Sequence, residues 1–266
     1  MRRAPRRVAA TLLLLLASRA AAWADEAAPP EFAVHLEAAR YAPVETDLYW
    51  TGWIGAGAEV LKVGRAAGYF EADVETVLGN TLRPFEATQA NYHLEPGARL
   101  AVGGGAVEVF FHHVSRHYVD RPKIQAVDWN VLGVRARGRL GRRLRVPGWF
   151  MASAGRVIQR SLVGYRWELV GRIEADVLPR PWGAAYLRGG LRAVKAAASE
   201  QLPRGSFVDL GAEGGLRWDR GGRRLALYAA WERRNDVFLE EPGRRDRGIL
   251  GLRIDYATTP APSWRR

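Results

Sequence analysis

The sequence predicts an all-β protein, a transmembrane antiparallel β-barrel of twelve strands. Three observations lead to this prediction. Long segments alternate apolar and charged residues with a period of two, aromatic residues lie near the segment ends, and the links between segments alternate between short and long. A barrel whose outer face meets lipid and whose inner face is polar has these features.

The alternation is clearest in residues 163–177. One face carries Val163, Tyr165, Trp167, Leu169, Gly171, Ile173, Ala175 and Val177, and the other carries Arg166, Glu168, Val170, Arg172, Glu174 and Asp176. In a soluble sandwich the apolar face would point into a core, whereas in a membrane barrel it points at lipid. Strands of this length exceed the roughly 5–6 residues usual in globular proteins, which favours the barrel.

The same alternation places twelve strands along the chain, with ten as the alternative number because boundaries shift by a few residues. The predicted strands are 31–41, 47–63, 66–78, 89–102, 105–119, 124–139, 143–159, 162–177, 182–196, 206–219, 223–234 and 247–257. Links after even-numbered strands are mostly tight, as at residues 64–65 and 103–104, and several after odd-numbered strands are longer. Short periplasmic turns, longer external loops and internal termini are therefore expected.

The aromatic residues near strand ends are expected to form girdles at the two membrane interfaces. They are Trp50, Trp53, Tyr69, Trp149, Trp182, Trp218, Trp231 and Tyr256.

The two ends of the chain indicate export. Residues 1–24 combine a basic start, a short apolar run and Ala22-Trp23-Ala24, which predicts a signal peptide. An uncleaved N-terminal anchor is the alternative. The barrel is predicted to span residues 25–257 in the bacterial outer membrane, followed by a flexible tail at 258–266. The chain has no cysteine, which excludes disulfides and thiolate metal sites.

The charge of the chain is strongly positive, with a formal net charge of +12 at pH 7. A basic protein can bind nucleic acid, but an exported chain rarely meets it, so no nucleic-acid partner is expected. Arginines that pair with acids in the lumen, or that face anionic lipid phosphates, are the favoured interpretation.

A histidine-rich segment, residues 110–118, lies at the external end of the fifth predicted strand. Period two continues the outward face from Val109 to His113, Ser115 and His117, and it continues the outward face of the sixth strand to Asn130 and Asp128. The inward face of the fifth strand carries Glu108, His112 and Arg116. The hairpin is thus expected to bring His113, Ser115 and Asn130 or Asp128 together outside.

These residue types suit nucleophilic catalysis. Serine attacks an ester only when a base removes its proton, and the histidine base needs a third group to fix its tautomer. Ser115 Oγ is then expected within about 3.5 Å of a His113 ring nitrogen. The alternatives are inert polar residues at the interface, or a metal site formed by His113, His117 and Asp120.

A resemblance supports the catalytic interpretation. The pattern His113-x-Ser115, Asp120-Arg121-Pro122 and Trp129-Asn130-x-Leu132-x-x-Arg135 resembles the signature of the outer-membrane phospholipase A family. That resemblance implies a twelve-stranded barrel that hydrolyses phospholipid acyl esters, with His113 as base, Ser115 as nucleophile and Asn130 as orienting residue. It also implies activation by calcium and by dimerisation, although the family's calcium ligands do not align here.

The His-x-Ser pair is also similar to that of the lipid A 3-O-deacylases, and this similarity would make Asp128 the third member. The expected partner is membrane lipid or lipopolysaccharide, and the barrel would be a monomer or a homodimer. The alternative function is a structural barrel or narrow transporter without catalytic activity.

Overall fold

The computed structural model describes residues 30–45, 47–119, 127–140, 146–198, 205–235 and 244–258. Within them, twelve antiparallel strands form a single closed barrel, which confirms the predicted fold class and strand number. The strands are β1 (Phe32–Glu45), β2 (Leu48–Val63), β3 (Ala66–Gly79), β4 (Glu86–Val102), β5 (Gly105–Tyr118), β6 (Val127–Arg139), β7 (Gly148–Ser161), β8 (Tyr165–Arg180), β9 (Gly183–Ala196), β10 (Phe207–Arg220), β11 (Arg223–Arg234) and β12 (Arg245–Ala257).

Two predictions concern residues outside this description. The signal peptide at 1–24 lies entirely outside it, and of the predicted tail only Thr258 is described. In the part of the chain that is described, no helix is long and apolar enough to cross a membrane.

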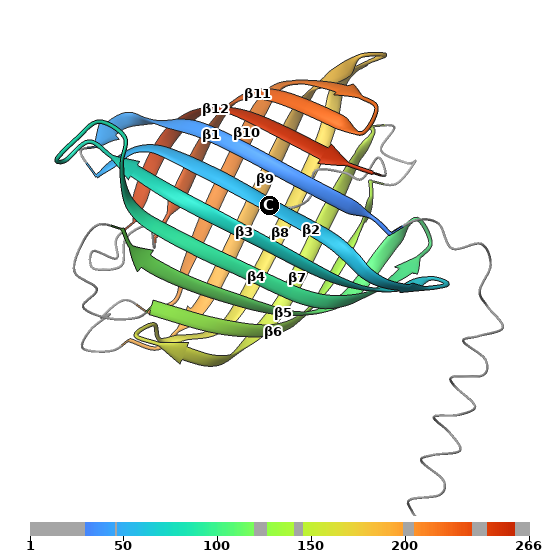
Figure 1. Ribbon diagram of the computed structural model, residues 1–266, viewed down its shortest axis with the longest axis horizontal. Coiled ribbons are helices and arrows are strands. Elements are labelled where there is room, and N and C mark those ends of the chain that lie inside the picture. The colour runs from blue at the N-terminus through green and yellow to red at the C-terminus, as the bar shows by residue number, and fades with distance from the viewer. Residues whose placement is uncertain are drawn as a thin grey trace, which may run out of the picture.

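The first and last strands close the barrel. β1 pairs with β12 from Ala33 opposite Ala257 to Ala42 opposite Gly248. Figure 1 shows these two strands side by side on the same wall, with the start of β1 and the end of β12 at the same end of the barrel. Since lipid offers no hydrogen-bond partners, a sheet can span a membrane only when closure pairs both of its edges.

Turn geometry distinguishes the two ends of the barrel. The end that holds both strand termini has two-residue links at residues 64–65, 103–104, 181–182 and 221–222. Gly103 and Gly104 have φ values of +54° and +83°, a left-handed conformation that a tight hairpin requires and that glycine adopts without strain. We call this the periplasmic end, and the opposite end, with links such as 119–126 and 197–206, the external end.

The outer face is apolar over its middle. Val107 and Val109 on β5 and Leu132 and Val134 on β6 are each about half exposed, and comparable leucines, isoleucines and valines recur around the barrel. Soluble monomers rarely expose an apolar surface of this extent. Together with a charged interior, it is the surface of a bacterial outer-membrane barrel.

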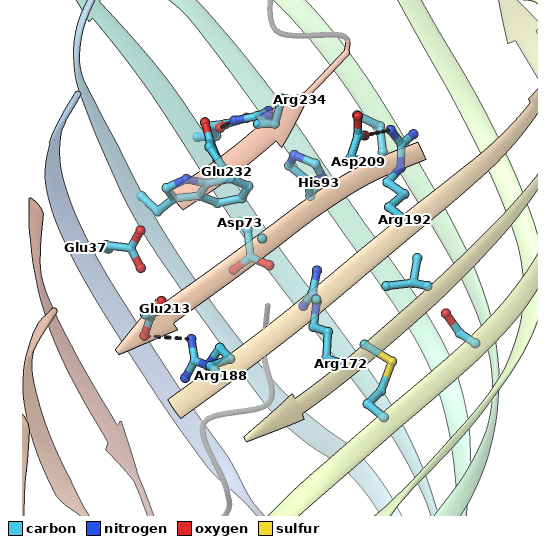
Figure 2. A pocket seen from close by; sticks show the side chains of 18 of the residues that line it. Glu37, Asp73, His93, Arg172, Arg188, Arg192, Asp209, Glu213, Glu232 and Arg234 are labelled. Atoms are coloured by element: carbon cyan, nitrogen blue, oxygen red, sulfur yellow. Dashed lines mark hydrogen bonds and ion pairs between the residues drawn. The ribbon is translucent and has the colours of Figure 1, made fainter. Parts of the chain in front are cut away.

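The inner face is an ion-pair network. Arg135 reaches Glu95 at 2.6 Å and Arg192 reaches Glu168 at 2.7 Å, while Arg253 bridges Glu37 and Glu213 at 2.6 and 2.9 Å. Figure 2 shows Arg188 and Arg192 directed at acids within the lumen. The long side chains leave a cavity of about 470 Å³.

Three of the predicted girdle residues instead point into the lumen. Trp53 lines the lumen cavity and packs against His93, while Tyr69 and Trp149 are buried. Trp182, Trp218, Trp231 and Tyr256 are exposed on the outside as expected. Position near a strand end alone therefore assigned too many aromatic residues to the interfaces.

A β-bulge in β8 changes which of its residues face lipid. The register between β8 and β9 shifts between Tyr165 and Trp167, so Arg166 is an extra residue there. Val163 and Tyr165 were predicted to face lipid with Trp167, but they are buried, 5% and 3% exposed. The extra residue reverses the alternation, because a bulge puts two residues opposite one.

The lumen network predicts how the barrel responds to losing one acid. Glu174 is buried and accepts hydrogen bonds from Arg188 at 2.6 Å and Arg217 at 2.7 Å. Glu174→Gln should lower the free energy of unfolding by about 3 kcal/mol, because it removes the buried negative charge that both guanidinium groups contact, although each keeps another acid in the lumen. Urea unfolding in lipid vesicles, followed by tryptophan fluorescence, measures this change.

The control is an exposed acid that also pairs with two arginines. Asp246 accepts from Arg233 and Arg244, both at 2.9 Å, and Asp246→Asn should change stability little, since exposed pairs contribute little. Equal losses in the two variants would show that burial of the network does not matter.

Candidate active site

The β5–β6 hairpin sets the candidate catalytic residues side by side. His113 lies directly opposite Asn130, and Ser115 lies directly opposite Asp128. Directly opposite residues share a face of the sheet, and all four follow the outward alternation of Val109 and Leu132. The structure therefore places these four residues outward at the external end, as predicted. His112 and Arg116 lie on the inward face.

His113 is bonded to Asn130. The His113 Nδ1 and Asn130 Oδ1 atoms are 2.6 Å apart. Asp128 lies across from Ser115 instead, so of the two orienting residues considered from the sequence, Asn130 is the one that contacts the histidine. This arrangement is that of a base whose ring is held by a third residue.

A third strand contributes Gln159, which was not predicted. Asn130 Nδ2 donates to Gln159 Oε1 at 2.6 Å, and Gln159 Nε2 donates to Asp128 Oδ1 at 2.9 Å. The β6–β7 register shifts between Asn130 and Val131, which leaves Ile158 as an extra residue. This bulge turns Gln159 to the outer face, whereas Val157 stays buried inside.

The chain of hydrogen bonds has a defined direction. An ionised carboxylate only accepts, so Asp128 must face the amide nitrogen of Gln159. The Gln159 oxygen then accepts from the Asn130 nitrogen, and the Asn130 oxygen is left to accept from His113. The proton of a neutral His113 therefore resides on Nδ1, and Nε2 keeps the lone pair that a general base requires.

Ser115 is not joined to this chain. Within the described ranges, no hydrogen bond connects Ser115 Oγ to His113, so the expected short contact between them is absent. The two residues lie two apart on one strand, with Cα atoms about 6.6 Å apart on the same face. Catalytic hydrogen bonds are often loose before substrate binds, and here Asn130 holds the His113 ring although Ser115 does not contact it.

The metal interpretation finds no support where it can be examined. His117 packs edge-on against Tyr92, with ring centroids 5.4 Å apart. Asp120, the third proposed ligand, lies outside the described residues. Among those described, no three histidine, aspartate or glutamate side chains are grouped to hold a metal ion.

The hairpin that carries the site is packed on its inner side. Val114, Trp129 and Val131 point inward from β5 and β6 into a buried apolar cluster. The Trp129 ring meets Tyr165 edge-on at 5.2 Å, and the Arg116 guanidinium lies 5.2 Å from the Trp129 ring centre. Close packing restricts side-chain and backbone movement, so the strand segments that carry the outward residues are held in place from the inside.

Comparison with known proteins adds a fold likeness but no family. No protein-family model matches the chain, and no curated protein matches it significantly. Among solved structures, it is similar to the translocator domain of autotransporter NalP from Neisseria meningitidis, at 10% identity and a TM-score of 0.45, over 94% of this chain and 96% of that chain. The β domain of the Bordetella autotransporter Brka gives 12% identity and a TM-score of 0.41, over 86% and 98%.

A Rhodopseudomonas blastica porin mutant is also similar, at 5% identity and a TM-score of 0.36, over 86% of this chain and 99% of that chain. Identities and TM-scores this low say nothing about what the present chain does.

The hydrogen-bond chain predicts the tautomer of His113. Nitrogen-15 correlation spectra of the histidine-labelled barrel should show His113 protonated on Nδ1 at neutral pH, and Gln159→Leu should shift its population toward the Nε2-protonated form. His117→Gln assigns the neighbouring resonance and should leave that of His113 unchanged. Protonation on Nε2 in the unmodified protein would contradict the hydrogen-bond direction.

Proposed function

We propose that this barrel is an acyl ester hydrolase that acts on phospholipid or lipopolysaccharide in the outer leaflet. The observation that carries the proposal is the 2.6 Å bond between His113 Nδ1 and Asn130 Oδ1, whose direction is set from Asp128 through Gln159. It leaves Nε2 of an outward histidine free to accept a proton, on the strand that carries Ser115.

The proposed reaction has two halves. Ser115 Oγ attacks the ester carbonyl carbon while His113 Nε2 takes the hydroxyl proton, and collapse of the tetrahedral intermediate breaks the bond to the alcohol oxygen, which His113 protonates. A water molecule, deprotonated by His113, then attacks the acyl-serine and releases the fatty acid and the serine hydroxyl. Asn130 accepts from Nδ1 throughout and stabilises the imidazolium that forms in each half.

The surroundings of the site suit a lipid substrate. Leu94 lies directly opposite His113 on β4 and is 39% exposed, and Leu132 continues the outer face of β6 at 49%. The catalytic side chains thus stand where the apolar outer face gives way to polar residues. A lipid packed against these leucines places its ester groups near this boundary, between its acyl chains and its headgroup.

Acyl release from mixed micelles of phospholipid and lipopolysaccharide tests the proposal, with and without calcium. Ser115→Ala should abolish release, and Asn130→Ala should lower kcat on the order of a thousandfold, because the histidine loses the group that fixes its tautomer. The matched control is Ser153→Ala, which makes the same change in the lumen lining and should leave release unchanged.

The converse result is equally informative. A barrel whose heat-modifiable gel migration shows that it is folded, and which releases no fatty acid under any condition, is not a hydrolase. Conductance in planar bilayers that Ser115→Ala does not change would then assign the protein to the transporters.

A further inference from the structure

A basic patch lies on the lipid-facing surface beside the hydrogen-bonded residues and extends from β7 to β9. Arg156 on β7 lies directly opposite Trp167 on β8, which lies directly opposite Lys195 on β9. Arg156 also lies opposite Leu132, an outward residue of β6. The basic patch therefore consists of Arg156, Trp167 and Lys195 in one row across three strands, and all three are exposed.

The row marks the edge of the apolar surface. Below Trp167 the outer face of β8 continues with Leu169 and Ile173, about half exposed, and below Lys195 that of β9 continues with Leu191. All three strands have their external ends within a few residues of the row. Two cations beside a tryptophan at this level lie where lipid headgroups meet a barrel.

The cations of the patch have no acidic partner. In the described part of the chain, neither Arg156 nor Lys195 forms an ion pair, although lumen arginines such as Arg253 have two acids each. The Arg156 guanidinium lies 5.9 Å from the centre of the Trp167 ring. This contact orients the arginine without neutralising it, because an aromatic ring carries no charge.

The spacing of the patch suits a single phosphate. One strand, β8, separates Arg156 from Lys195, so their backbones are two strand spacings, roughly 10 Å, apart. Both side chains are long enough to converge above the Trp167 ring. Arginine binds phosphate through two parallel hydrogen bonds and lysine acts as a point charge. Arg166, the extra residue of the β8 bulge, is exposed beside them and adds a third positive charge.

We propose that Arg156, Trp167 and Lys195 bind the phosphate of an anionic membrane lipid in the outer leaflet. Charge complementarity carries the assignment, because two cations at the membrane surface without protein counter-ions attract an anionic headgroup. The site does not depend on hydrolysis, since it is built on β7–β9 and uses neither His113 nor Ser115.

The test is native mass spectrometry of the full-length barrel in neutral detergent, titrated with diether phosphatidic acid. Ether chains cannot be hydrolysed, so the outcome is separate from that of the proposed reaction. Diether phosphatidylcholine serves as the zwitterionic comparison, and inorganic phosphate as a soluble competitor. The first phosphatidic acid should bind more tightly than the first phosphatidylcholine, and inorganic phosphate should not displace it.

Substitutions locate the lipid. Arg156→Gln and Lys195→Gln should each weaken binding of the first phosphatidic acid by about fivefold, as expected for one cation near a membrane surface. Arg40→Gln is the matched control: Arg40 is also exposed and lies opposite a tryptophan, Trp50, but Leu250 takes the place of the second cation in its row. It should leave binding unchanged within error.

Three results would overturn the proposal. Equal affinity for the two lipids would remove the role of the anionic headgroup. An Arg40→Gln effect as large as that of Arg156→Gln would mean a general response to positive charge, and displacement by inorganic phosphate would mean a site for soluble anions. Heat-modifiable gel migration shows whether each variant is folded. If either Arg156→Gln or Lys195→Gln does not fold, the other variant is still compared with Arg40→Gln.

Discussion

The constraint on which the structure depends is that a backbone in lipid must satisfy its own hydrogen bonds. Pairing of β1 with β12 meets it by leaving the sheet without an edge. Closure then divides every strand into a face toward lipid and a face toward the lumen. A polar side chain on the lipid face costs free energy unless it is hydrogen-bonded, and Asn130, Gln159 and Asp128 are bonded to one another there.

The same division explains the lumen. With the apolar residues committed to the outer face, the interior is filled by arginines and acids whose charges must be paired. Glu174, which is 1% exposed, is contacted by three arginines. Glu108 is contacted by Arg99, Arg135 and Arg137. At the external end the filling changes to the apolar cluster around Trp129. The site on β5 and β6 thus lies over the part of the wall whose interior resembles a soluble protein core.

Sequence reasoning recovered what depends on one strand at a time. Period two assigned the faces of β5 and β6 correctly, including the outward His113 and Ser115 and the inward His112, because alternation follows from strand geometry alone. The number of strands followed from the same alternation, together with tight links such as Gly103-Gly104. The roles of Ser115 and His113 stay predictions, since neither the geometry nor the comparisons test them.

What could not be predicted depends on pairing between strands. Ile158 and Arg166 are extra residues only relative to the strands beside them, and nothing in their own segments distinguishes them from ordinary strand residues. Each bulge reverses the alternation next to it. Period two therefore did not predict Gln159 at the site or Tyr165 in the lumen. The choice between Asn130 and Asp128 likewise needed the β5–β6 register.

The depth of the site follows from the same energetics. A polar residue that faces lipid costs most at the middle of the bilayer and little at its edge, so an outward catalytic site is affordable only near a rim. Going up β6, the exposed Leu132 is followed on the same face by Asn130 and then Asp128, so the change from apolar to polar takes place within two residues. The ester groups of a lipid lie at this same boundary between chains and headgroup. The position that membrane energetics allows for a polar site is therefore also the position at which, in the proposed reaction, an outward serine would meet an ester.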